Sequence, residues 1–409
     1  MAQQLLFTEA HIGPMTLRNR AVRSAAFEGM GHANGPTQML HDYHVSVARG
    51  GVGMTTLAYA AVCQSGLSFE TQLWLRPEIE EDLRKITDDI HKAGAKASIQ
   101  IGHCGNMTHR ATAGQTPVGP SSGFNLYSPT WCRALRDDEL HEIAQQFGEA
   151  VRTARRAGFD CVEVHAGHGY LISQFLSPYT NRRQDQYGGS LDNRMRFMRM
   201  CMEQVIDAAA DDMAVVVKTN MRDGFKGGLE IDDCITVAKE LERLGAHALV
   251  LSGGFVSKAP MYVMRGEMPL YSMTHYMRQW WLKYSVRMVG KYMIPPVPYQ
   301  DLYFLPDALR FRDELHGKLI YVGGAVSREG IEQVLNEGFE AVQMGRALLR
   351  DPEFVNHLRQ GQERCDCDHV NYCIARMYSR EMACHKCLAG KLPPRIVKEI
   401  EQIKARQKR

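Results

Sequence analysis

The sequence lacks a strong charge of either sign, a long hydrophobic run and a leader-like N-terminus. Lys and Arg number 49 against 46 Asp and Glu, and a net charge of only +3 argues against a dedicated nucleic-acid binder. No apolar run approaches the roughly 18 residues that a membrane helix needs. The first residues (MAQQLLFTEAHIG) have no basic region followed by an apolar core. We therefore expect a cytoplasmic protein with no nucleic acid and no membrane as partner.

Cysteine is present in an odd number and is unevenly distributed. Of the 11 cysteines, five lie between Cys365 and Cys387 and the others are scattered over the first 234 residues. An odd number in an intracellular chain argues against a disulfide framework, so the terminal group indicates a metal site or redox chemistry. The hydrophobic fraction of 44% is sufficient for a substantial core and disfavours disorder.

Short apolar runs alternate with longer helical stretches along most of the chain. Continuous runs such as AVVVK are typical of parallel strands covered on both faces, and Leu140–Ala157 and Asp232–Leu244 fit crossover helices. The eight runs are Arg20–Ala26, Met54–Leu57, Lys96–Gln100, Cys161–His165, Val215–Lys218, Ala248–Ser252, Leu319–Gly323 and Ala341–Met344. They predict an α/β fold, a (β/α)8 TIM barrel over residues 1–360. A doubly wound sheet is disfavoured because the first run is not followed by a glycine-rich turn.

Two regions exceed what a barrel requires. Residues 255–317, between the sixth and seventh strands, are rich in Met, Tyr and Trp, and part of them must form the sixth crossover helix. The rest is either ordinary core or an adaptable apolar lid over a binding site. Residues 361–409 carry the cysteine group and end in a charged segment (RIVKEIEQIKARQKR) that predicts a solvated terminal helix. We expect them to form a tail outside the barrel.

Polar residues and glycines stand where the predicted strands end, which is where barrels carry their chemistry. The polar residues are Gln100, His103, His165, His168, Tyr170 and Lys218. Gly323-Gly324 and Gly345-Arg346 follow the last two strands, where a backbone can approach a ligand closely and a helix N-terminus attracts anions. The two pairs predict a phosphate-bearing cofactor.

The pattern His165-x-x-His168-x-Tyr170 is the strongest chemical signal in the chain. Two imidazoles from one strand end can both donate hydrogen bonds to a single oxygen and polarise a carbonyl or an enolate. A nearby phenol can serve as a general acid in a site shielded from water. The alternatives are a zinc pair and purely structural histidines, and zinc would need a further carboxylate or cysteine close by.

Residues 165–197 (HAGHGYLISQFLSPYTNRRQDQYGGSLDNRMRF) resemble the signature segment of the Old Yellow Enzyme family of FMN-dependent ene-reductases. The resemblance is to the branch with bacterial NADH:flavin oxidoreductases and 2,4-dienoyl-CoA reductases, and it extends over roughly residues 5–360. Supporting segments occur in the family's order: LRNRAVRSAA (Leu17–Ala26), IQIGHCG (Ile99–Gly105), VVVKTN (Val215–Asn220), YVGGAVSREG (Tyr321–Gly330) and VQMGRALLRDPEF (Val342–Phe354).

The resemblance implies FMN as cofactor and NAD(P)H as reductant. Gln100 would bind the flavin pyrimidine edge, and Lys218 would lie beside its N1 and O2. His165 and His168 would hold the electron-withdrawing oxygen of the substrate while Tyr170 donates a proton to its α-carbon. The FMN phosphate would be held by Gly323, Gly324, Gly345 and Arg346, and the flavin would be lined by Ser24, Ala25, Ala26, Ala58 and Tyr59.

The sequence departs from this family at several positions. The run Ser24-Ala25-Ala26-Phe27 lacks the Thr or Cys that often tunes the flavin potential, Lys218 replaces a frequent Arg, and Tyr59 replaces a common Gly. Multi-domain relatives bind a [4Fe–4S] cluster through Cys-x2-Cys-x3-Cys-x11-Cys. This chain has Cys365-x-Cys367-x5-Cys373-x10-Cys384-x2-Cys387. Free or redox-active thiols, an iron–sulfur cluster and zinc therefore all remain open for the tail.

The interpretation that these observations favour is an enzyme that reduces an alkene activated by a carbonyl or similar group, with NAD(P)H and FMN. The chain has no room for a second dinucleotide fold, so NAD(P)H is expected to bind directly over the flavin. Alternatives are an FMN barrel that dehydrogenates an amine or oxidises NAD(P)H, and a non-catalytic flavin- or metal-binding subunit. The partner is a small-molecule substrate, and a homo-oligomer stays open.

Overall fold

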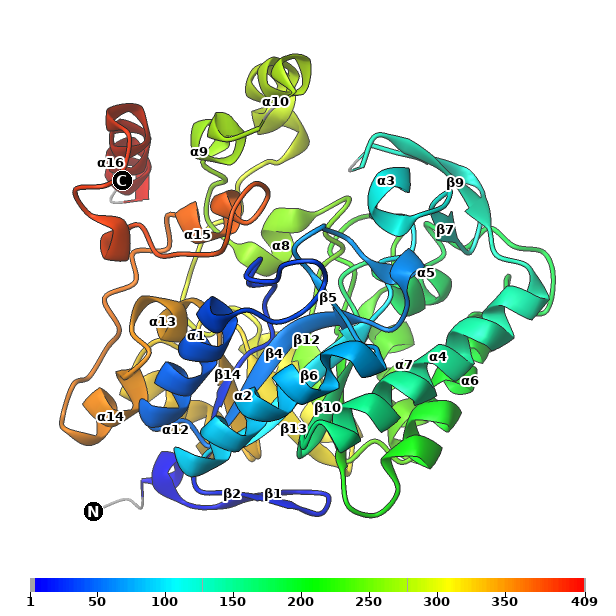
Figure 1. Ribbon diagram of the computed structural model, residues 1–409, viewed down its shortest axis with the longest axis horizontal. Helices are drawn as coiled ribbons and strands as arrows, with labels where there is room; N and C mark the ends of the chain where they lie inside the picture. The colour runs from blue at the N-terminus through cyan, green and yellow to red at the C-terminus, as the bar shows by residue number, and fades with distance from the viewer. Residues whose placement is uncertain (1–3, 127, 278, 408–409) are drawn as a thin grey trace.

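The computed structural model describes residues 4–126, 128–277 and 279–407 and contains a closed barrel of parallel strands surrounded by helices (Figure 1). The barrel strands are β3 (Ala21–Arg23), β4 (Met54–Ala61), β6 (Lys96–Gly102), β10 (Cys161–Ala166), β11 (Ala214–Asn220), β12 (Ala248–Ser252), β13 (Lys318–Val322) and β14 (Ala341–Met344). Pairing of β3 with both β14 and β4 closes the barrel. The predicted (β/α)8 fold is confirmed, and each of the eight predicted runs overlaps one barrel strand.

Helices cover the outside of the barrel. The crossover helices are α1 (Gln38–Arg49), α2 (Glu80–Lys92), α4 (Asp137–Arg156), α6 (Leu191–Ala209), α7 (Ile231–Arg243), α11 (Leu305–Glu314), α12 (Arg328–Asn336) and α14 (Phe354–Arg359). Local signals fix several ends: the Ser190 hydroxyl accepts from the N–H of Asn193 at the start of α6, and α2 has acidic residues in its first turn and basic ones in its last. Their apolar faces pack on the outward-facing strand residues.

The amino end of the barrel is closed by a hairpin of β1 (Ala10–Ile12) and β2 (Met15–Leu17). Its buried residues pack in one cluster with inward-facing residues of the strands, among them Cys161, Val216 and Ile320. Gly13 sits in the turn with φ of +53°, and a β-carbon there would meet the His247 ring at 2.6 Å. This end is therefore filled with side chains, and any site must lie at the other end.

The carboxyl end of the barrel carries the additional elements. They are β5 (Leu73–Trp74), α3 (Arg110–Ala113), β7 (Val118–Gly119), β8 (Gly123–Asn125), β9 (Thr130–Ala134), α5 (Leu171–Leu176), α8 (Pro260–Met264), α9 (Leu270–His275), α10 (Trp280–Met293) and α13 (Arg346–Arg350). In Figure 1 the α9–α10 pair and the α3–β9 region rise above the barrel, at the end opposite the β1–β2 hairpin. Of residues 255–317, only α11 takes the place of a crossover helix.

The C-terminal tail forms α15 (Tyr372–Arg376) and α16 (Pro394–Gln407), both beside α9. The charged terminal helix is present, but it is not solvated on all sides, because Ile396, Ile400 and Ile403 are buried against Tyr271 and Tyr276. The division of the chain at about residue 360 into barrel and tail stays a prediction. Among the described residues, no helix has both the length and the apolar character that crossing a bilayer requires.

Candidate active site

The pleat of the strands places the candidate polar side chains inside the barrel. Successive residues of a strand point to opposite faces, so Glu163 and His165 follow the inward-facing Cys161 of β10, and Lys218 follows the inward-facing Val216 of β11. The strand register pairs His165 with Lys218 and Glu163 with Gln100. The lower layer of the barrel is thus apolar, and the layer above it is polar.

Glu163 is the centre of a buried polar network. Its carboxylate accepts hydrogen bonds from Gln100 Nε2 at 2.7 Å and Gln343 Nε2 at 2.6 Å, and it pairs with Lys218 Nζ at 2.8 Å. Ser24 Oγ donates to Gln343 Oε1 at 3.0 Å. Burial lowers the pKa of Lys218, and the Glu163 carboxylate opposes that shift. The network joins Gln100, Lys218 and Ser24, three of the predicted flavin contacts, into one rigid unit.

His165, His168 and Tyr170 lie together above this network. The ring centroids are 5.1 Å apart for His165 and His168 and 4.3 Å apart for His165 and Tyr170. His168 has φ of +58°, and its backbone N–H donates to Asn220 Oδ1 at 2.9 Å while its Nε2 lies 2.7 Å from Ser252 Oγ. These contacts hold a strained turn that aims its ring at that of His165. The predicted catalytic residues are therefore brought together.

Burial sets the protonation states in this cluster. It lowers the pKa of His168 to about 3, with a smaller contribution from Lys218, and it lowers the pKa of His165 for the same two reasons and through His168. It raises the pKa of Tyr170 above its ordinary value. The imidazoles are neutral near pH 7 and the phenol keeps its proton, so the cluster offers hydrogen-bond donors and one weak acid.

Tyr59 belongs to the same cluster. Its ring stands edge-on to Tyr170, with centroids 5.0 Å apart, and its hydroxyl lies 2.7 Å from Ser68 Oγ and 3.0 Å from the carbonyl oxygen of Gly66. Tyr59, which stands where the resembling family commonly has a glycine, thus narrows the site. It also packs edge-on against His165, with centroids 6.2 Å apart.

Glycines and a half-buried arginine line the region that was predicted to hold a phosphate. Gly323 and Gly324 have φ of +135° and +75°, conformations that side chains with a β-carbon rarely adopt. A β-carbon at Gly345 would meet no atom within 4 Å, whereas one at Gly324 would meet Leu302 N at 2.8 Å. Arg346 Nη1 donates to Asn371 Oδ1 at 2.7 Å. Open space therefore lies beside Gly345, and residues 300–303 cover Gly324.

The remaining predicted flavin contacts follow β3 and lie within β4. The backbone N–H of Ala58 donates to both carboxylate oxygens of Glu28 at 3.2 Å, and Glu28 pairs with Arg23 at 2.6 Å. Ser24 continues the barrel register by donating its N–H to the Met344 carbonyl, and Ala25 and Ala26 follow it. His103 is not in the His165 group; it is held by Ser65 at 3.1 Å, and burial lowers its pKa to about 3.

The tail contributes to the cover of this end of the barrel. The N–H of Met382 donates to the Glu28 carbonyl at 2.7 Å, and the Tyr378 ring stands edge-on to Phe69, with centroids 6.4 Å apart. Beneath this cover His165 and Gln100 are each 4% exposed and Lys218 is 2% exposed. A site so well shielded from water strengthens every electrostatic contact within it.

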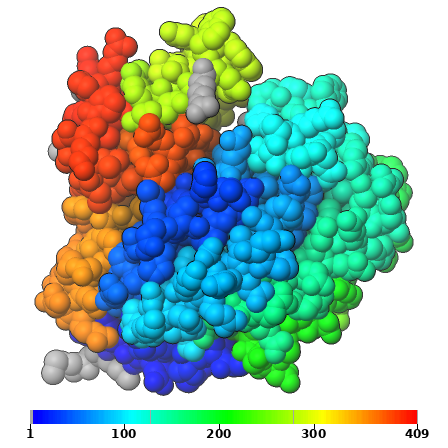
Figure 2. All heavy atoms as spheres, viewed as in Figure 1, coloured from blue at the N-terminus to red at the C-terminus, as the bar shows by residue number. Residues whose placement is uncertain are grey.

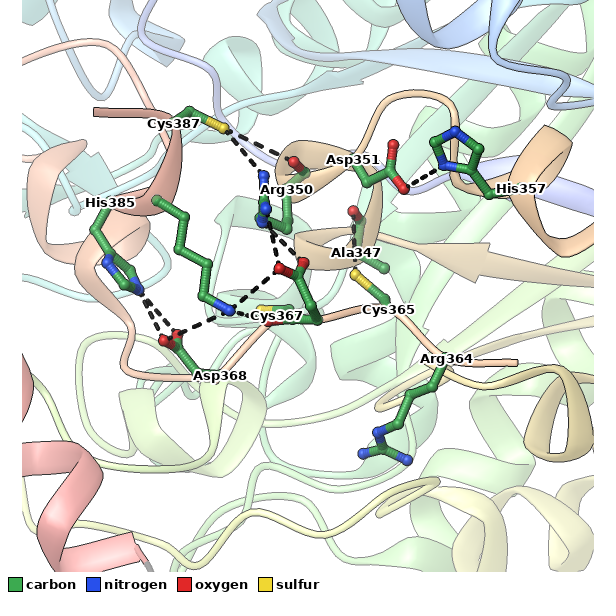
Figure 3. A network of polar contacts seen from close by, with 12 residues as sticks. Ala347, Arg350, Asp351, His357, Arg364, Cys365, Cys367, Asp368, His385 and Cys387 are labelled. Carbon is green, nitrogen blue, oxygen red and sulfur yellow. Dashed lines mark hydrogen bonds and ion pairs between the residues drawn. The ribbon is translucent and has the colours of Figure 1, made fainter. Parts of the chain in front are cut away.

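Three of the five cysteines of the tail, Cys365, Cys367 and Cys387, have separate partners (Figure 3). Cys365 Sγ donates to the Ala347 carbonyl at 3.7 Å, Cys367 Sγ lies 3.8 Å from His369 Nδ1, and Cys387 Sγ lies 3.8 Å from Arg350 Nη1. All eleven cysteines, which lie in the described part of the chain, are free thiols. No three His, Cys, Asp or Glu side chains among the described residues are grouped as metal ligands. Burial raises the pKa of Cys373 to about 12 and that of Cys384 to about 11, which disfavours the reactive thiolate.

The polar layer and the region around Gly345 fit FMN, which is a flavin with a phosphate ester. The His165 Nδ1 atom is buried without a hydrogen-bond partner in the described part of the chain, and such an atom requires a partner. Lys218 provides a buried cation, Gly345 adjoins open space, and the Arg346 guanidinium lies nearby in sequence. Together these features match the donor and cation set that a flavin ring and its phosphate need.

Several residues of the site are absent from the sequence-based prediction. Glu163 and Gln343 organise the polar network, Glu28 and Arg23 adjoin the flavin wall, and Ser252 holds His168. A signal existed for two of them. Glu163 and Gln343 are polar residues inside apolar strands, and Glu163 shares the face of His165 because the two are separated by two positions.

The closed barrel, with a shielded donor cluster at the carboxyl end of its strands, defines a TIM-barrel oxidoreductase of the FMN-binding kind. A family model described as "NADH:flavin oxidoreductase / NADH oxidase family" matches residues 5–297. The chain belongs to this family, which is that of Old Yellow Enzyme. It is an NAD(P)H:flavin oxidoreductase that uses FMN, as the sequence predicted.

Individual relatives differ in the activities for which they are named. The chain is 38% identical over 376 residues to a 4,4'-dithiodibutanoate disulfide reductase of Rhodococcus erythropolis, with 91% of this chain and 93% of the relative covered. It is 31% identical to an NADH oxidase of Thermoanaerobacter brockii, with 90% and 52% covered. The chain thus spans about half of that second relative. An old yellow enzyme homologue from Zymomonas mobilis has the same fold, with a TM-score of 0.72 at 23% identity and 92% and 96% covered.

Proposed function

We propose that the protein reduces carbon–carbon double bonds conjugated to a carbonyl or similar group. The observation that carries this proposal is the set of three neutral donors, His165, His168 and Tyr170, in one shielded cluster. Two neutral imidazoles suit a carbonyl oxygen whose negative charge grows during the reaction. An amine substrate offers no such oxygen, which disfavours amine dehydrogenation.

Each residue has a distinct role in this proposal. His165, through its unpartnered Nδ1, donates a hydrogen bond to the bound oxygen. His168 is held in place by Ser252 for the same task. Tyr170 donates its proton to the α-carbon, and the Glu163 network keeps Lys218 and Gln100 fixed beneath the substrate. FMN, when reduced by NAD(P)H, supplies the hydride.

A second candidate is the reduction of a small disulfide, and it is favoured by the relative at 38% identity, which is named for that activity. Reduction of a disulfide by two electrons and one proton gives a thiol and a thiolate. A thiolate is a stable leaving group near pH 7, so this reaction needs no strong proton donor. The two reactions therefore differ in their dependence on Tyr170.

Anaerobic stopped-flow measurements on Tyr170→Phe test the proposal. Oxidation of the reduced flavin by 2-cyclohexenone should slow by about 10²- to 10⁴-fold, since a general acid contributes that much, while reduction of the flavin by NADPH should change little. Tyr59→Phe is the matched control, because its hydroxyl is bound to Ser68 and Gly66 in the same cluster. Equal losses in both half-reactions would contradict the role of Tyr170.

The same pre-reduced enzyme, mixed with 4,4'-dithiodibutanoate, separates the two candidates. Fast oxidation by the disulfide that is unaffected by Tyr170→Phe, together with slow oxidation by every enone, would favour the second candidate. Fast oxidation by enones with strong dependence on Tyr170 favours the first.

A further inference from the structure

The molecule presents large apolar side chains to solvent in two places at the carboxyl end of the barrel. On α10 they are Trp280, Trp281, Tyr284, Met288, Tyr292 and Met293, which are 51–78% exposed. On the β8–β9 hairpin they are Phe124, Leu126 and Trp131, which are 50–69% exposed. We call the two sets the α10 face and the β8–β9 face. Figure 2 shows the two segments that carry these sets, yellow-green and cyan, at the same end of the molecule.

The two faces are unusual in their tryptophan content. The chain contains four tryptophans, and three of them, Trp131, Trp280 and Trp281, are exposed and belong to the two faces. Tryptophan is highly buried on average, and its exposure is characteristic of residues that meet a partner or the headgroup region of a bilayer. Scattered apolar exposure of the ordinary kind does not concentrate in this way.

The charge on α10 is positive and unpaired within the part of the chain that the structure describes, whereas beside the β8–β9 face Arg133 and Arg136 pair with Glu139 and Asp138. Residues 103–136 and 268–300 contain no Asp or Glu, although 46 of the 409 residues are acidic. On α10, Lys283 donates to the His275 carbonyl and Arg287 to Thr274 Oγ1, both neutral, and Lys291 is exposed. None of these three side chains forms an ion pair with a described residue. The surface is complementary to an anionic partner, and a second copy of the same face would repel it.

We propose that the α10 face and the β8–β9 face dock the protein on an anionic lipid bilayer, with the mouth of the barrel turned toward the lipid. A helix with exposed Trp, Tyr and Met beside Lys and Arg lies in the interface plane rather than across the membrane. The expectation of no membrane partner rested on the absence of a spanning segment, which does not bear on this mode of binding. The docking does not depend on which substrate the enzyme reduces.

Vesicle flotation with the holoenzyme tests the docking. The protein should bind vesicles in which about a third of the lipid is phosphatidylglycerol, should bind phosphatidylcholine vesicles at least about tenfold more weakly, and should be released as salt rises. Trp281→Ser/Met288→Ser should reduce binding about tenfold or more. Lys291→Glu should do so only on anionic vesicles. Binding should also shift the tryptophan emission to shorter wavelength.

Two matched controls separate docking from general surface chemistry. Met39→Ser on α1 removes a methionine that is 53% exposed, comparable to Met293 at 51%, and Lys92→Glu reverses a charge on α2. Both should bind as the wild type does. Absence of binding to anionic vesicles, or equal binding by Trp281→Ser/Met288→Ser, overturns the proposal. A dimer that Trp281→Ser/Met288→Ser dissociates, in a protein that ignores vesicles, overturns it in favour of self-association.

Discussion

At the scale of single residues, burial decides what the cluster at the end of β10 can do. His168 is neutral because a charged imidazole would be desolvated beside Lys218, and burial and the same neighbours act on His165. A neutral imidazole donates one hydrogen bond and still responds to charge on a bound oxygen, whereas two imidazolium ions would repel each other and Lys218. The pair is therefore suited to stabilise a developing oxyanion rather than to supply protons, and that task falls to Tyr170.

The neutral state of His168 makes folding sensitive to pH. In the unfolded chain the imidazole takes up a proton near pH 6.5, but in the folded protein it stays neutral down to about pH 3, so acid favours the unfolded state across that window. His168→Asn should therefore lose less stability than the wild type as the pH falls. The difference should reach about 2 kcal/mol between pH 6.5 and 5, by urea denaturation.

His141→Asn is the control for this measurement. His141 is exposed on α4, and the ion-pair partner that the structure gives it, Asp137, lies one turn earlier on the same exposed helix face. Its substitution should leave the pH dependence of stability as it is in the wild type. If the stability of His168→Asn depended on pH as strongly as that of the wild type, His168 would be protonated in the folded protein.

At the scale of elements, the sequence predicts the strands well and their surroundings poorly. The eight runs overlap the eight barrel strands because parallel strands covered on both faces are continuously apolar, a local signal. The run Arg20–Ala26 shortens to β3, Ala21–Arg23, because the chain leaves the barrel at Ser24. The residue contacts of the site could be only partly predicted. Polar residues at strand ends can be recognised in the sequence, but the role of Glu163 depends on its hydrogen bonds with Gln100 and Gln343, which lie far away in sequence.

The terminal helix α16 illustrates the same limit. Its charged composition predicted a solvated helix, yet Ile396, Ile400 and Ile403 recur at helical spacing and form a buried stripe. The partner of that stripe is α9, which lies more than a hundred residues earlier, and no local sequence pattern predicts this contact. Glu399 fixes the contact, since its carboxylate accepts from the N–H groups of Tyr271 at 2.7 Å and Ser272 at 2.8 Å.

Glu399→Ala should loosen α9 from α16. It removes two hydrogen bonds to the first N–H groups of α9 and one to the Ser272 hydroxyl, and stability should fall by about 2 kcal/mol. Trypsin cleavage after Lys283 and Arg287 in the adjacent α10 should become faster. Glu401→Ala is the control, because the exposed Glu401 pairs only with Lys404 on the same helix. Unchanged cleavage would mean that the isoleucine stripe alone holds α16.

At the scale of the whole molecule, a barrel complete in itself carries a cover drawn from distant segments. All eight barrel strands and their crossover helices lie before residue 360, while the cover joins α8–α10 to the tail through shared apolar contacts. The tail reaches the site end at Glu28 and Phe69 and holds Arg346 through Asn371. We therefore expect the barrel to form the flavin site and the cover to limit the access of solvent to it.

Deletion of residues 361–409 tests that separation. The shortened chain should still fold cooperatively and bind FMN, because Gln100, Lys218, Glu163 and the two glycine pairs all remain. Without the contacts of Met382 and Tyr378, the flavin should become severalfold more accessible to iodide quenching. Loss of cooperative unfolding, measured by circular dichroism, would show instead that the tail is part of the barrel's own fold. A folded variant with unchanged quenching would assign the cover to α8–α10 alone, where Met261, Met268 and Met273 pack in one cluster.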